Sequence, residues 1–194
     1  MTLSQRIGFG FYRLLGWRIE GEFPALQKML VIGAPHTSNW DFVFMVPYMM
    51  AMRVQIRFLG KDSLFRGPLG VLMRKLGGIP VQRGARLNAV EQAIQLFNTS
   101  ESLILVMSPE GTRKKTDGWK SGFYHIARGA NVPLVLGYLD YAGKRAGLGP
   151  AIHLTGDIEA DLARIAAFYA DKRGKRPELE TPARLAAKSS PASS

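Results

Sequence analysis

The chain has 194 residues, of which 46% are hydrophobic, and it contains no cysteine. This length is enough for one well-filled core and too short for two full-sized domains with a linker. The lack of cysteine excludes disulfides, thiolate nucleophiles and thiolate metal sites. The formal net charge is +11. A negatively charged partner is therefore expected, namely nucleic acid, an anionic membrane surface or a phosphorylated substrate.

The positive charge is concentrated in the middle of the chain. Between Arg53 and Arg86 there are eight basic residues and one acidic residue, and between Arg113 and Arg128 there are five against one. Residues 157–185, by contrast, carry six of each sign. The sequence has no basic tail and no recognisable nucleic-acid motif, so no nucleic-acid partner is expected.

The first predicted element is an amphipathic helix within residues 1–20. Apolar residues recur there at helical spacing, with arginines between them: Leu3, Ile7, Phe11, Leu14 and Leu15 alternate with Arg6, Arg13 and Arg18. Such a helix suits the headgroup region of an anionic membrane; the alternative is a helix that packs on its own domain. No apolar run reaches the roughly 18 to 20 residues that span a bilayer. We therefore expect a peripheral, monotopic protein at the cytoplasmic face of the cell membrane.

Short apolar runs alternate with helical patterns over residues 21–171. Strands are predicted at 29–33, 55–60, 79–81, 102–107, 132–139 and 151–155. Helices are predicted at about 41–52, 64–76, 88–98, 119–129 and 159–170. This alternation predicts a single α/β domain with a mixed, mostly parallel sheet flanked by helices. Residues 172–194 are rich in charge, proline, alanine and serine, which predicts a disordered tail.

Polar residues follow several of these predicted strands. His36 and Asp41 come after the first strand, Arg83 after the third, and the segment PEGTR at 109–113 after the fourth. In open α/β sheets, ligands bind at the carboxyl ends of the strands. The sequence therefore predicts that these side chains meet at one edge of the sheet and form a site.

His36 and Asp41 have the residue types of a catalytic base and its partner. An imidazole accepts a proton near neutral pH, and a carboxylate on its other nitrogen fixes the tautomer. The chain has no G-x-S-x-G motif, so such a base would activate water or a substrate alcohol. The alternatives are a structural histidine and a helix-capping aspartate. One histidine with scattered carboxylates does not suggest a metal site.

Four segments resemble a known family when they are taken together. They are HTSNWD (36–41), LGKDSLFRGPLGVLMRKLGGIPVQR (59–83), SPEGTR (108–113) and VPLVLGYL (132–139). In this order they are similar to the sequence blocks of the glycerophospholipid acyltransferases, the family of 1-acylglycerol-3-phosphate acyltransferase. The resemblance covers about residues 30–140.

The resemblance implies an acyltransferase with no cofactor beyond its acyl donor. It implies transfer of an acyl chain from acyl-CoA or acyl carrier protein to a hydroxyl of a lysophospholipid, with His36 as general base and Asp41 orienting it. It also implies that a further set of residues binds the substrate phosphate: Lys61, Arg83, Glu110, Gly111, Thr112 and Arg113. Two alternatives stay open, namely another lysolipid acceptor such as an ornithine lipid, and a hydrolase that uses the same pair.

Overall fold

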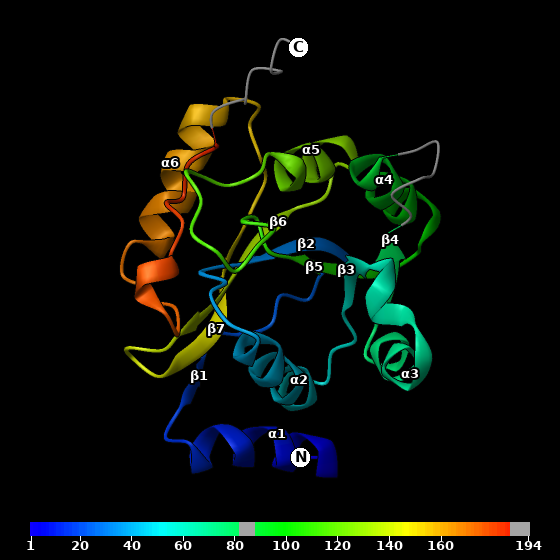
Figure 1. Cartoon of the computed structure of the whole chain (residues 1–194), viewed down its shortest axis with the longest axis vertical. Coiled ribbons are helices and arrows are strands. Elements are labelled where there is room, and N and C mark those ends of the chain that lie inside the picture. The colour runs from blue at the N-terminus through cyan, green and yellow to red at the C-terminus, as the bar shows by residue number, and fades with distance from the viewer. Residues whose placement is uncertain (82–87, 187–194) are drawn as a thin grey trace.

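One mostly parallel sheet organises the computed structural model, which describes residues 1–81 and 88–186 (Figure 1). The strands are β1 (Arg18–Glu20), β2 (Lys28–Gly33), β3 (Arg57–Lys61), β4 (Gly78–Val81), β5 (Leu103–Met107), β6 (Leu134–Asp140) and β7 (Arg145–Ile152). Within the described residues, their order in the sheet is β1-β7-β6-β2-β5-β3-β4. Neighbouring strands are parallel except β6 and β7, which are antiparallel. The predicted fold class is confirmed.

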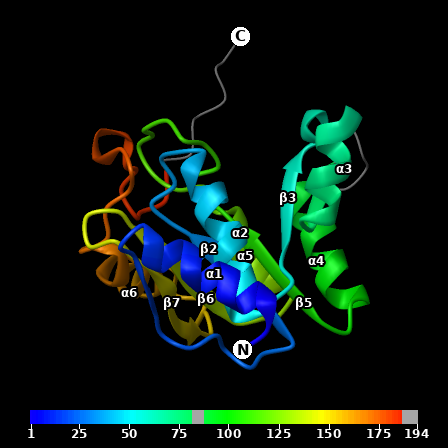
Figure 2. The ribbon, with the colours of Figure 1, turned by 90° about the horizontal axis from the view of Figure 1, so that it is seen from below.

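Helices cover both faces of this sheet. They are α1 (Leu3–Leu14), α2 (Trp40–Met52), α3 (Gly67–Lys75), α4 (Ala89–Thr99), α5 (Gly122–Gly129) and α6 (Ile158–Tyr169), with 3-10 turns η1 (Asp62–Phe65) and η2 (Pro177–Leu179). Figures 1 and 2 show α4, α5 and α6 on one face, α1 and α2 on the other, and α3 beside β3. Of the helices described, none combines the length and the apolar character needed to cross a membrane.

Strand β2 lies in the middle of the core because both of its faces are apolar. Leu30 and Ile32 belong to the large cluster that α4, α5 and α6 cover. Met29 and Val31 belong to a smaller cluster on the opposite face. A continuous apolar run is expected for a parallel strand that is buried on both sides. The loop that follows β2 therefore starts from a firmly packed position.

The predicted helices and strands are present, with two differences. β7 begins at Arg145, six residues before the predicted start, because glycines and a proline interrupt its apolar pattern and pairing with β6 defines it instead. The three-residue β1 was not predicted; it is short, and it forms by pairing with β7. The N-terminal helix ends at Leu14, and residues 18–20 already belong to the sheet.

The segment 171–186, which we call the C-terminal strap, is ordered and so differs from the disordered tail predicted for residues 172–194; residues 187–194 of that prediction lie outside the described residues. The N–H of Arg176 donates to Thr37 Oγ1 at 3.1 Å. Further along, the N–H of Trp119 donates to the carbonyl of Arg184 at 2.6 Å, and Ala186 donates back to Trp119 at 2.9 Å. These partners lie far away in the sequence. Composition alone could not reveal them, since a polar segment is ordered here by bonds to distant loops.

Helix α1 approaches α2 closely at one glycine. A Cβ on Gly8 would lie 2.5 Å from both the nitrogen of Ala51 and the carbonyl oxygen of Pro47, whereas a Cβ on Gly10 would have nothing within 4 Å. Tyr12 lies on the same face, where its hydroxyl donates to the carbonyl of Phe44 at 2.8 Å. The packing of α1 therefore depends on the missing side chain of Gly8.

We predict that Gly8→Ala lowers the free energy of unfolding by roughly 1 to 3 kcal/mol, because the added methyl group pushes the helices apart. Gly10→Ala is the matched control. It should raise the free energy of unfolding by about 0.5 to 1 kcal/mol through the higher helix propensity of alanine. Urea denaturation of the two variants measures both effects. Equal stability of the two variants would contradict the close helix contact.

Candidate active site

Three neighbouring strands bring polar side chains to one edge of the sheet. β2 pairs in parallel with β5 on one side and with β6 on the other. Their carboxyl ends therefore point the same way. His36 lies in the loop after β2, Glu110 in the loop after β5, and Tyr141 directly after β6. The sequence predicted the first two of these residues at this edge.

The predicted His36–Asp41 pair is formed. The Nδ1 atom of His36 lies 2.9 Å from Oδ2 of Asp41, and their side chains are 28% and 10% exposed. Asp41 stands in the first turn of α2, and its Oδ2 also accepts the N–H of Ser38 at 3.2 Å. The first turn of α2 therefore holds the Asp41 carboxylate next to the imidazole ring of His36.

This contact determines the tautomer of the neutral imidazole. A carboxylate oxygen only accepts hydrogen bonds, so Nδ1 of His36 must carry the proton that it shares with Asp41. The other nitrogen, Nε2, then presents its lone pair. Nε2 has no hydrogen-bond partner within the part of the chain that the structure describes. The ring is therefore free to take a proton from a bound molecule.

Glu110 binds the backbone of His36. Its Oε1 accepts the backbone N–H of His36 at 2.9 Å, and the residue is 1% exposed. Burial raises the pKa of Glu110 to about 7, although the hydrogen bond from His36 acts in the opposite direction. In this structure Glu110 therefore contacts the backbone of the loop that carries His36. The phosphate-binding role that the resemblance implies for Glu110 stays a prediction.

The structure describes some of the other predicted phosphate-binding residues and not others. Gly111 adopts a positive φ of 65°, Thr112 is half-buried and accepts the N–H of Lys114, and Arg113 is exposed. Among the described residues, no carboxylate forms an ion pair with Arg113. Lys61 ends β3, but its side chain lies outside what the structure describes, and so does all of Arg83.

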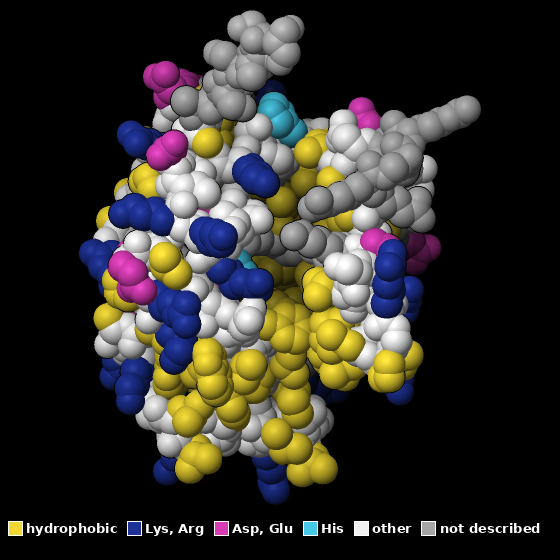
Figure 3. Space-filling view, viewed as in Figure 1, with side chains coloured by type: hydrophobic (Ala, Val, Ile, Leu, Met, Phe, Trp, Pro, Cys, Tyr) yellow, Lys and Arg dark blue, Asp and Glu magenta, His cyan; other side chains and the backbone are white. Residues whose placement is uncertain are grey.

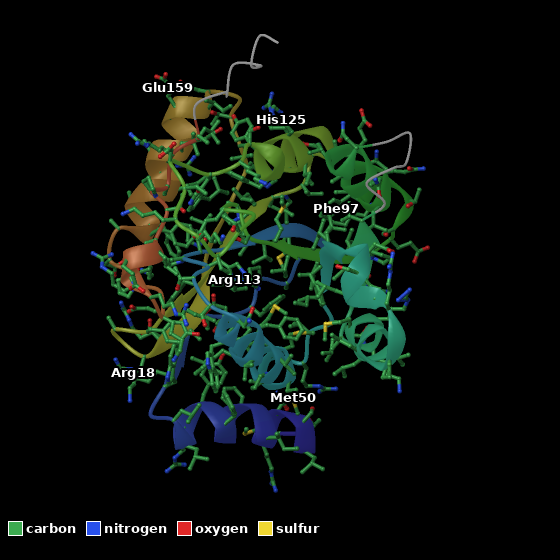
Figure 4. All side chains as sticks on the ribbon, in the orientation of Figure 1. Arg18, Met50, Phe97, Arg113, His125 and Glu159 are labelled. Carbon is green, nitrogen blue, oxygen red and sulfur yellow. The ribbon has the colours of Figure 1, made fainter. Side chains whose placement is uncertain are left out.

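The surface around the pair combines basic and apolar areas. Figure 3 shows lysine and arginine side chains gathered above a band of apolar side chains that lies over α2 and α1. Figure 4 labels Arg113, in the loop after β5, and His125, on α5. His125 and His153 are both exposed. A molecule with a negative group and an apolar chain would find both kinds of surface here.

Two further features of the described residues concern what His36 could act with. No group of three or more histidine, cysteine, aspartate or glutamate side chains there could hold a metal ion. Two hydroxyls lie close to the pair in sequence: Oγ1 of Thr37 accepts the N–H of Arg176 at 3.1 Å, and Oγ of Ser38 accepts the N–H of Trp40 at 3.2 Å.

The sequence did not single out Tyr141. Its hydroxyl donates to Oδ1 of Asp41 at 2.8 Å, across 100 positions of sequence. The one available signal was its place just after the predicted strand at 132–139, which puts it at the same edge as His36. A tyrosine beside an apolar strand is an ordinary core residue, so nothing in the pattern marked it.

The raised pKa of Glu110 predicts a stability change with pH. Folding raises this pKa above its value in the unfolded chain, so the folded protein binds the proton more tightly. The contribution is complete below about pH 4.5 and is lost as the pH rises through about 7. Relative to Glu110→Gln, the wild type should lose roughly 2 to 3 kcal/mol of unfolding free energy over that interval.

Urea denaturation of both proteins between pH 4.5 and 8 measures this difference. The exposed Glu178 gives the control, because Glu178→Gln should follow the wild type at every pH. A difference between wild type and Glu110→Gln that stays constant with pH would show that folding does not raise the pKa of Glu110.

Comparison with known proteins gives two findings. A family model described as Acyltransferase matches residues 18–136. Among solved structures, the chain is similar to the crystal structure of the 1-acyl-sn-glycerophosphate (LPA) acyltransferase PlsC from Thermotoga maritima. The TM-score is 0.59 and the sequence identity 19%, over 87% of this chain and 75% of that chain. Similarity at this identity shows a shared fold. No curated protein matches the chain.

Proposed function

The chain belongs to the acyltransferase family, and we propose that it moves a fatty acyl chain from a thioester to a lysophospholipid hydroxyl. The donor is acyl-CoA or acyl carrier protein, and 1-acylglycerol-3-phosphate is the leading acceptor. One observation carries the proposal. His36 has Nδ1 bound to Asp41, and among the described residues Nε2 has no hydrogen-bond partner.

In the proposed reaction, His36 acts on the acceptor directly. Nε2 takes the proton of the acceptor hydroxyl while the oxygen attacks the thioester carbonyl carbon, and Asp41 stabilises the imidazolium that forms. The tetrahedral intermediate then expels the thiolate as the carbon–sulfur bond breaks. The imidazolium returns the proton to the sulfur, so the products are an ester and a free thiol. No acyl-enzyme forms, which agrees with the lack of cysteine.

The basic residues around this edge suit a phosphate on the acceptor. Arg113 is exposed and has no carboxylate partner among the described residues, so its guanidinium is available for a bidentate contact with phosphate. We assign the same role to Lys61 and Arg83 from their place in the sequence. The name of the similar Thermotoga maritima enzyme, which acts on 1-acyl-sn-glycerophosphate, supports this choice of acceptor.

The acyl chain would lie against α2. Phe42, Met45 and Met49 are half-buried on this helix, and methionine adapts to flexible apolar ligands. The apolar band in Figure 3 runs over the same helix. Delivery of such a substrate fits a peripheral protein at the cytoplasmic face of a membrane.

An acyl-transfer assay tests the proposed function. We predict that the purified protein releases thiol from palmitoyl-CoA or palmitoyl acyl carrier protein only when detergent-dispersed 1-acylglycerol-3-phosphate is present. His36→Ala should lower the rate by about 10²- to 10⁴-fold, since it removes the base. His125→Ala, at an exposed position on α5, should leave the rate unchanged.

Each departure from this result has a defined meaning. Thiol release that does not depend on any acceptor would identify a hydrolase. Activity restricted to a lyso-ornithine lipid would change the acceptor and keep the reaction. If neither donor releases thiol with any lysolipid, the proposed function is wrong.

The exposed side of α1 should bind an anionic membrane. Leu3, Ile7 and Leu14 are 75%, 51% and 86% exposed, although Gly8 and Tyr12 on the same helix are buried against the domain. The buried face of α1 therefore supports packing on the domain, and its exposed apolar face supports contact with a membrane. Apolar side chains beside arginines are typical of helices that lie in the headgroup region.

We predict that the double variant Ile7→Ser, Leu14→Ser binds vesicles of phosphatidylcholine with phosphatidylglycerol at least about tenfold more weakly than the wild type. The loss follows from the apolar area that two serines no longer bury. Leu26→Ser, on an exposed loop residue before β2, is the control and should bind normally. Co-sedimentation measures the bound fraction. Equal binding by all three proteins would show that α1 does not contact the membrane.

A further inference from the structure

We propose that Tyr141 is a positioning residue that fixes the carboxylate of Asp41 and, through it, the tautomer of His36. The proposal deepens the proposed function and rests on it for its catalytic consequence. Tyr141 lies outside residues 18–136, which the family model matches. Its role is inferred from the contacts of this chain alone.

The two oxygens of Asp41 have different partners. Oδ2 accepts from Nδ1 of His36 at 2.9 Å and from the N–H of Ser38 at 3.2 Å. Oδ1 accepts the hydroxyl of Tyr141 at 2.8 Å, and no other donor to Oδ1 is present among the described residues. With one oxygen fixed by Tyr141, the carboxylate cannot rotate about its Cβ–Cγ bond without breaking a charge-assisted hydrogen bond.

The ring of Tyr141 is itself held on several sides. It meets the ring of Trp17 edge-on, with 4.9 Å between centroids, and that of Phe44 at 5.7 Å. The ammonium group of Lys175, in the C-terminal strap, lies 5.5 Å from its centroid. The backbone N–H of Tyr141 donates to the carbonyl of Arg173 at 2.8 Å. The hydroxyl therefore has a defined direction before Asp41 is considered.

The neighbouring ion pair anchors the same backbone. Asp140 accepts two hydrogen bonds from Arg145, at 3.0 and 2.7 Å, and one from the N–H of Arg173 at 3.2 Å. Burial alone would raise the pKa of Asp140, but these hydrogen bonds hold it below its usual value. The residue before Tyr141 is thus tied both to β7 and to the strap.

The hydroxyl of Tyr141 keeps its proton at neutral pH and can therefore donate a hydrogen bond. Burial, followed by the charge of Asp41 and the hydrogen bond to it, raises the pKa of Tyr141 above its ordinary value. A neutral phenol beside a carboxylate has one arrangement in which both are satisfied, with the hydroxyl proton pointing at Oδ1. Tyr141 is therefore the donor and Asp41 the acceptor in this hydrogen bond.

The kinetic test compares two tyrosines. Tyr141→Phe keeps the ring and removes the hydroxyl, and we expect kcat to fall about tenfold with KM for donor and acceptor unchanged. Tyr138→Phe is the matched control, because its hydroxyl donates at 2.9 Å to Glu20, outside the His36–Asp41 pair. In an Asp41→Asn background, Tyr141→Phe should have no further effect, since Tyr141 acts through Asp41.

A spectroscopic test needs no activity. With ¹⁵N-labelled histidine, the Nδ1 and Nε2 shifts of His36 report which nitrogen carries the proton, and His36→Ala identifies its signals. We expect the Nδ1–H form in the wild type and a shift toward the Nε2–H form, which an isolated histidine side chain prefers, in Tyr141→Phe. Tyr138→Phe should match the wild type.

The outcomes separate the two proposals. Unchanged ¹⁵N shifts in Tyr141→Phe, or an equal loss of kcat in Tyr138→Phe, would overturn the role of Tyr141. Full additivity with Asp41→Asn would do the same, because it means that Tyr141 acts elsewhere. A wild type without transfer activity would refute the proposed function, while the ¹⁵N shifts would still decide whether Tyr141 sets the tautomer.

Discussion

The parallel pairing of β2 with β5 and β6 is the constraint on which the rest of the site depends. Three neighbouring strands that run the same way end at the same edge, so the loops after them must meet. His36, Glu110 and Tyr141 each follow one of these strands. The apolar run of β2 is buried on both faces, and this burial supplies the rigidity that short polar loops lack. The position of the imidazole is thus a consequence of hydrophobic packing behind it.

Two carboxylates flank the histidine in opposite environments. Asp41 accepts hydrogen bonds from His36, Ser38 and Tyr141. Glu110 accepts one from the backbone of His36, its second oxygen has no partner among the described residues, and burial raises its pKa. The first arrangement fixes the orientation of a carboxylate that contacts the imidazole ring. The second holds the backbone of the loop that carries the histidine.

The sequence predicted the α/β fold, the mostly parallel sheet and the meeting of His36 with Asp41, because apolar periodicity and local spacing carry that information. It could not predict the burial of Glu110, since a glutamate after a strand looks the same whether it faces solvent or the core. Tyr141 and the strap were missed for a related reason. The bond between Tyr141 and Asp41 joins residues 100 positions apart, and the bond between Arg176 and Thr37 joins residues 139 apart. Neither apolar period nor composition encodes such a pairing.

The strap has a consequence for how the site is assembled. Gly174 packs so closely on the loop after β2 that a Cβ there would lie 2.7 Å from Oγ1 of Thr37, and Arg176 bonds to the same hydroxyl. Synthesis proceeds from the N-terminus, so the loop that carries His36 leaves the ribosome well before the segment that covers it. Until then, Thr37 has neither of these contacts. The loop that carries His36 is therefore made early and is among the last parts to reach its final surroundings.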